Sequence, residues 1–133
     1  MRTLSRACPP DARPLCEAPR RHRLLLFTKG DPSEQLRKLD RSGLRPFFKH
    51  VGVPVEKDSS NYLLLIAQAE LDPSRTFMIG NSPRSDINPA LKAGLRAVFI
   101  PHPHTWELEH EEIDHADKRL TVITAFPHLL EVF

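Results

Sequence analysis

The sequence lacks the features of a secreted protein, of a protein stabilised by a structural zinc ion, and of a membrane-spanning protein. It contains only two cysteines, Cys8 and Cys16, and no second close pair that would complete a structural zinc site. Nothing in this cysteine usage suggests a disulfide scaffold. No apolar run approaches the ~20 residues that a membrane helix needs, and the arginine-containing start has no apolar signal-peptide core. We therefore expect a cytoplasmic protein without a membrane partner.

The charge balance gives little attraction for nucleic acid. The formal net charge of the 133 residues is +2, and 40% of the residues are hydrophobic and 27% charged, which is ordinary for a globular chain. Arginines crowd the N-terminal segment, but no aromatic residues are interleaved with them. We expect a Pro/Arg-rich, loosely structured lead-in over residues 1–22 with a short helix at 12–18, then one core domain over 23–133.

Apolar runs alternate with helical patterns along the core domain. This alternation predicts βαβ units with a parallel sheet and helices on both faces, which is a three-layer α/β/α, Rossmann-like architecture. The region from 102 to 119 is polar and irregular, with room for one helical turn. The expected strands are 23–28, a short strand within 47–55, 76–79, 97–100 and 120–123, and the expected helices are 32–42, 59–71, 85–93 and 125–132.

The helix ends and inward faces can also be predicted. Asp31 is a suitable N-cap for the first helix, either Asp58 or Ser59 for the second, and Gly43 is a natural helix stop. The first helix is expected to turn Leu36 and Leu39 inward. The second is expected to bury a broad apolar set, namely Leu63, Leu64, Ile66, Ala67 and Leu71.

Three polar features stand at or just beyond expected strand ends. Thr28 ends the first strand, Lys57 follows the second, and the Gly80–Asp86 loop follows the third. Ligands of open parallel sheets bind at the carboxyl ends of the strands, so these features share one edge. A hydroxyl donor, an ammonium and a carboxylate that holds Mg²⁺ meet the needs of phosphoryl transfer, where catalysis is mostly positioning and electrostatic stabilisation. Lys29 is a further candidate for binding phosphate.

Each residue also has an ordinary structural explanation. A threonine can simply end a strand, a lysine is usually solvated, and an aspartate at a helix start complements the helix dipole. The order and common edge of Thr28, Lys57 and Asp86 favour the functional interpretation.

From Arg23 to Ile123 the chain resembles the haloacid dehalogenase-like hydrolase superfamily. The resemblance implies that Thr28 binds a non-bridging phosphoryl oxygen, that Lys57 neutralises phosphoryl charge, and that Asp86 holds Mg²⁺. Asn81 stands where the family commonly has an aspartate, so we expect Asn81 to be a weak or water-mediated metal contact. Ser85 stands where the family frequently has an asparagine.

The family's first motif, an Asp-x-Asp strand that carries the nucleophile, has no match before Thr28. Only Asp11 precedes Thr28, in a Pro-rich stretch without an apolar strand. The family's cap insertion, which would also lie upstream, has no match either. We therefore expect a truncated core that lacks the usual first strand and has little turnover alone. Its exposed sheet edges would favour self-association or pairing with a complementing chain.

Two other interpretations remain open. The chain could be a catalytically dead binding or interaction module, or the C-terminal half of a split enzyme; a receiver-like signalling domain fits the order of residues less well.

The histidines at 102, 104, 110 and 115 suggest a transition-metal site, but their irregular spacing favours a solvated loop. By resemblance the substrate is a phosphorylated small molecule.

Overall fold

The computed structural model describes residues 22–103, 105, 107–125 and 128–129. The chain divides into two compact units, one of residues 1–55 with 125–133 and the other of residues 56–124. The expected lead-in helix at 12–18 lies outside the described residues, as does most of the expected last helix.

The first unit contains a parallel strand pair. β1 (Leu25–Phe27) and β2 (His50–Gly52) align Leu25 with His50 and Phe27 with Gly52. Between them run α2 (Pro32–Ser42) and the 3₁₀ turn η4 (Arg45–Phe47). The predicted strand within 47–55 is shorter than expected, because the helical turn that begins at Arg45 includes Pro46 and Phe47, and Pro54 has no N–H for a ladder.

The ends of α2 are as predicted from sequence. The Asp31 side chain accepts a hydrogen bond from the Glu34 N–H at 3.0 Å, and Gly43 ends the helix in the left-handed conformation with φ of 73°. Leu39 is buried and Leu36 is half-buried, so both predicted inward positions are confirmed.

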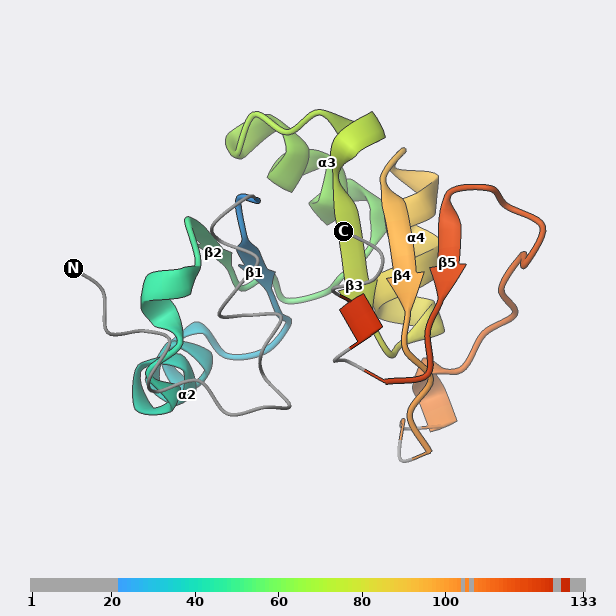
Figure 1. Cartoon of the computed structure of the whole chain (residues 1–133). Coiled ribbons are helices and arrows are strands. Elements are labelled where there is room, and N and C mark those ends of the chain that lie inside the picture. The colour runs from blue at the N-terminus through green and yellow to red at the C-terminus, as the bar shows by residue number, and fades with distance from the viewer. Residues whose placement is uncertain (1–21, 104, 106, 126–127, 130–133) are drawn as a thin grey trace. The chain divides into compact units, whose positions relative to one another are not determined.

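The second unit contains a three-stranded parallel sheet. Its strands are β3 (Phe77–Gly80), β4 (Arg96–Phe99) and β5 (Leu120–Val122), which lie in the order β3–β4–β5 (Figure 1). Both pairings are parallel, and α4 (Asn88–Lys92) packs against β4. The predicted α/β, Rossmann-like class is therefore confirmed, with parallel strands and flanking helices.

The helix α3 (Ser59–Gln68) shows where the sequence prediction was wrong. It ends three residues earlier than expected: Glu70 adopts a positive φ of 52° and the Leu71 N–H bonds the Ile66 carbonyl at 2.9 Å. Ile66 and Leu71 are half-buried as expected, but Leu63 and Leu64 are 54% and 56% exposed, and Ala67 is also exposed. The buried face runs instead through Tyr62 and Leu65, because the helix turns this narrower stripe inward.

The helix predicted at 85–93 begins earlier and is not uniform. A π-helical turn, η6 (Pro83–Ile87), leads directly into α4. The Ser82 hydroxyl caps the turn by accepting from the Ser85 N–H at 3.0 Å, and Pro83 suits the first helical position. Ile87 and Leu91 pack with Ala97 in a buried core, which fixes η6 over the sheet.

The remaining elements are short. They are the 3₁₀ turns η5 (Pro73–Arg75) and η7 (Glu107–Glu109). The single turn η7 confirms the expected irregular segment after β4. Within the described part of the chain, no helix has the length and apolar character needed to cross a membrane.

Candidate functional site

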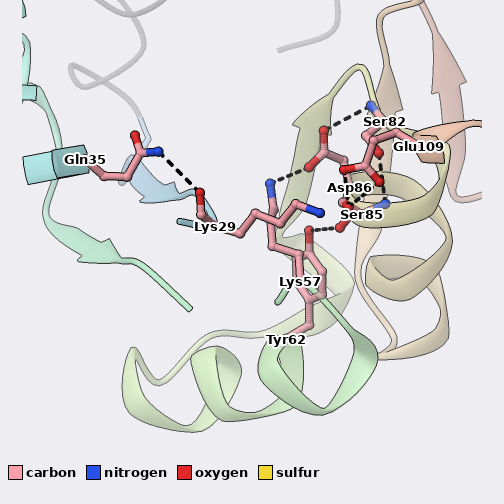
Figure 2. A network of polar contacts seen from close by, with 8 residues as sticks. All are labelled: Lys29, Gln35, Lys57, Tyr62, Ser82, Ser85, Asp86 and Glu109. Atoms are coloured by element: carbon pink, nitrogen blue, oxygen red, sulfur yellow. Dashed lines mark hydrogen bonds and ion pairs between the residues drawn. The ribbon is translucent and has the colours of Figure 1, made fainter. Parts of the chain in front are cut away.

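The site is centred on an ion pair between Lys57 and Asp86. The Lys57 Nζ donates to Asp86 Oδ1, and the two side chains are only 10% and 9% exposed (Figure 2). Lys57 directly precedes the Asp58 cap of α3, and Asp86 lies in the first turn of η6. Two of the predicted site residues, 29 positions apart, are therefore brought together in the second unit.

The second carboxylate oxygen of Asp86 is held by the backbone. The Ser82 N–H donates to Asp86 Oδ2 at 3.1 Å, so the loop that follows β3 closes around its own aspartate. Gly80 makes this closure possible, because a Cβ added there would lie only 2.7 Å from the Asp86 Cβ. The glycine is needed here for space rather than for an unusual backbone conformation.

Tyr62 is a member of the site that sequence reasoning missed. Its side chain is fully buried, and its hydroxyl donates to the Ser85 carbonyl at 2.8 Å (Figure 2). Burial raises the pKa of Tyr62 above its ordinary value of 10.0, and the nearby negative charge of Asp86 raises it further. The available signal was a tyrosine at the end of the first turn of a predicted helix, four residues after the Asp58 cap.

A loop clasp covers the acidic loop on its other side. We use this name for the hydrogen bonds that join residues 105 and 108–112 to Asn81 before η6, to Arg84 and Ser85 in η6, and to Asn88 at the start of α4. The clasp consists of Thr105 Oγ1 donating to the Asn81 carbonyl at 3.4 Å, Arg84 Nη1 to the Leu108 carbonyl at 3.2 Å, Ser85 Oγ to Glu109 Oε1 at 2.8 Å, and Asn88 Nδ2 to Glu111 Oε1 at 2.9 Å and to the Glu112 carbonyl at 2.8 Å.

The other predicted residues are not brought into this cluster. The Asn81 side chain is exposed, although its carbonyl joins the clasp. Thr28 and Lys29 follow β1 in the first unit, where the Thr28 N–H bonds the Gly52 carbonyl at 3.1 Å and the Lys29 carbonyl accepts from Gln35 Nε2 at 3.3 Å (Figure 2). Their convergence with Lys57 and Asp86 stays a prediction.

The residues around Asp86 suit a magnesium ion better than a transition metal. An ionised carboxylate has about four lone-pair sites, and on Asp86 the hydrogen bonds from Lys57 and Ser82 use two of them. Mg²⁺ takes oxygen ligands, keeps several waters and commonly binds through one or two carboxylates plus a substrate phosphate. Among the described residues, no group of three or more His, Cys, Asp or Glu side chains is arranged to hold a metal ion.

Comparisons with known proteins agree on one family. A family model described as HAD-hydrolase-like matches residues 58–123. A glyceraldehyde 3-phosphate phosphatase of Pyrococcus furiosus is 32% identical over 112 residues, which cover 80% of this chain and 45% of the relative.

Solved structures show the same fold. A haloacid dehalogenase-like family hydrolase from Xanthomonas campestris superposes with a TM-score of 0.77 at 27% identity, over 90% of this chain and 51% of that one. A magnesium-bound HAD-hydrolase from Bacillus subtilis superposes with a TM-score of 0.74 at 20% identity, over 89% and 52%. This chain thus spans about half the length of the relatives that it matches.

Proposed function

Because the chain belongs to the haloacid dehalogenase-like hydrolase family, we propose that Lys57 and Asp86 form the phosphoryl- and Mg²⁺-binding part of a phosphatase site. The observation that carries this proposal is the buried ion pair at the carboxyl end of β3, with Gly80 and the Ser82 N–H shaped around Asp86. Removing two charges from water costs free energy that is recovered only when the geometry of the ion pair is favourable. A buried ion pair is therefore unlike the incidental ion pairs of a protein surface.

Lys57 and Asp86 have different proposed roles because their charges are opposite. The Lys57 ammonium neutralises phosphoryl oxygens, and the Asp86 carboxylate holds the cation and keeps Lys57 oriented. When bound, Mg²⁺ supplies positive charge that stabilises the phosphoryl group in the transition state. Thr28 and Lys29 would add a hydroxyl and an ammonium from the first unit, and Asn81 would contact the ion weakly or through water.

The substrate class proposed is a phosphorylated small molecule. Support comes from the curated relative, which is named as a phosphatase of glyceraldehyde 3-phosphate. The sequence has no Asp-x-Asp before Thr28, so an aspartate nucleophile would have to come from another polypeptide or segment. We therefore expect the 133-residue chain to bind phosphate with Mg²⁺ but to hydrolyse esters little or not at all.

A second candidate is a catalytically dead binding module, or the C-terminal half of a split enzyme. The observation that favours it is the intact Lys57–Asp86 pair in a sequence without the nucleophile motif. A complementing chain that restored turnover would support the split enzyme. A clean, stable monomer that binds phosphate would favour the binding module.

The test is hydrolysis of a generic aryl phosphate by the purified chain with Mg²⁺. We expect no turnover above that of the Asp86→Ala variant. Mg²⁺-dependent turnover that Asp86→Ala abolishes would mean that the chain holds its own nucleophile. Turnover that survives both Asp86→Ala and Lys57→Ala would contradict the site assignment itself.

A further inference from the structure

Tyr62 links the helix that follows Lys57 to the backbone that carries Asp86. It is the only tyrosine of the chain. Its side chain has no exposed surface, and its hydroxyl donates to the Ser85 carbonyl at 2.8 Å. Ser85 directly precedes Asp86, so this bond holds the backbone from which the carboxylate projects.

The other end of the link is the start of α3. The Tyr62 N–H bonds the Asp58 carbonyl at 3.1 Å, and the Asn61 side chain donates to the Glu56 carbonyl at 2.9 Å. Glu56 and Asp58, the two neighbours of Lys57, are thus hydrogen-bonded to the first turn of the helix. Tyr62 belongs to that turn, so its position is coupled to the backbone of Lys57.

The contacts therefore form a closed ring. It runs from Lys57 along the first turn of α3 to Tyr62, crosses to Ser85, passes to Asp86, and returns through the ion pair to Lys57. We propose that Tyr62 is a positioning residue whose buried hydroxyl sets the separation of Lys57 and Asp86. This inference deepens the proposed function and rests on it only for the consequence for Mg²⁺ binding.

A phenol suits this role for physical reasons. The ring is rigid and has few rotamers, so a bond at its far end transmits position over the length of the side chain. A buried hydroxyl that satisfies a buried carbonyl is costly to lose, because the carbonyl would have no replacement from water. Residues that orient a metal ligand in this way commonly change metal affinity by roughly 10- to 100-fold when replaced.

The test uses the full chain with Tyr62→Phe, which keeps the ring and removes only the hydroxyl. A buried ammonium held by a carboxylate keeps its protons long enough to be seen by NMR, so lysine side chains are labelled with ¹⁵N. Lys57→Arg assigns the Lys57 signal, and Asp86→Asn serves as the reference for its loss. Mg²⁺ affinity is measured by calorimetry on the same samples.

A matched control is Thr76→Val in the same unit. It also removes a hydroxyl that donates to a backbone carbonyl, that of Asp72 at 2.7 Å, but lies at the opposite end of β3. We expect Tyr62→Phe to weaken or abolish the Lys57 ammonium signal and to lower Mg²⁺ affinity about tenfold, while Thr76→Val leaves both as in the wild type. An unchanged Lys57 signal in folded Tyr62→Phe would overturn the proposal.

The two proposals can fail separately. If the wild-type chain binds no Mg²⁺, the proposed function fails, whereas the Lys57 signal still decides the role of Tyr62. If Tyr62→Phe does not fold, 3-fluorotyrosine in the native sequence labels Tyr62 alone. We then expect its ¹⁹F resonance to shift in Asp86→Asn, and an unchanged resonance would overturn the link.

Discussion

At the scale of single residues, the site depends on the small residue Gly80 as much as on the charged residues Lys57 and Asp86. Gly80 leaves the space into which the Asp86 side chain fits, and no other residue has room there because a Cβ would lie 2.7 Å from the Asp86 Cβ. The neighbours that would have to move are the buried aspartate and the loop that bonds it, rather than a flexible surface side chain.

Gly80→Ala is therefore predicted to remove Mg²⁺ binding and to destabilise the second unit by about 2 kcal/mol, within the usual range for overpacking. Calorimetry and urea unfolding measure the two effects. Gly43→Ala is the control: it strains a left-handed position in the other unit and costs about 1 kcal/mol, but has no neighbouring atom within 4 Å. Normal Mg²⁺ binding by Gly80→Ala would contradict the steric argument.

The buried phenol of Tyr62 predicts a loss of stability at alkaline pH. Burial, and then the negative charge of Asp86, raise the pKa of Tyr62 in the folded protein above its ordinary value of 10.0. Because the pKa of Tyr62 is higher in the folded than in the unfolded protein, the contribution of Tyr62 to the free energy of unfolding is complete below pH 10. It decreases above pH 10, where the tyrosine of the unfolded chain ionises. The expected slope is about 1.4 kcal/mol per pH unit at most.

Urea unfolding between pH 8 and pH 11 measures this slope. Lysines also titrate in this range, so the informative quantity is the difference between the wild type and Tyr62→Phe. We expect the variant to lose the additional slope above about pH 10. Parallel curves for the two proteins would show that Tyr62 is ionised equally in both states.

At the scale of elements, the loop clasp explains how an irregular segment becomes part of the site. Its bonds reach the backbone of Asn81 before η6 and the side chains of Arg84, Ser85 and Asn88, while Asp86 faces Lys57 instead. Only Ser85 and Asn88 donate through side chains to carboxylates of the segment, and bonds to charged partners are the stronger ones.

Replacement of both Ser85 and Asn88 by alanine is predicted to release residues 107–112. Each lost bond is worth about 1 to 2 kcal/mol, so amide hydrogen exchange in this segment should accelerate by roughly tenfold or more. The amides of α3 should be unchanged. Exchange that accelerated equally in α3 would indicate general destabilisation rather than the release of a clasp.

The extent to which these elements could be predicted follows from their burial. The five strands were predicted from short apolar stretches that alternate with helical patterns, although only Ala97 and Val98 of β4 are fully buried in the structure. The inward face of α3 was not, because both Leu63 and Leu64 are as apolar as Leu65 and only the packing partners select among them. The Tyr62–Ser85 bond joins residues 23 positions apart, and no local pattern predicts such a pairing.

At the scale of the whole molecule, the second unit contains the residues of the proposed phosphoryl- and Mg²⁺-binding site. Lys57, Asp86 and their supports all lie within residues 56–124. The proposed contribution of Thr28 comes from the other unit, and the nucleophile motif has no match in the sequence. Binding without turnover is the behaviour that this division of residues predicts.

The most direct test is Mg²⁺-dependent binding of inorganic phosphate to the intact chain, measured by calorimetry. Asp86→Ala and Lys57→Ala are compared with Asp72→Ala, which removes an exposed carboxylate bonded to Ser74, and with Lys92→Ala. The account predicts phosphate binding that requires Mg²⁺, is lost in the first two variants and persists in the two controls. Phosphate binding that is unchanged in Asp86→Ala, or absent from the wild type, would contradict it.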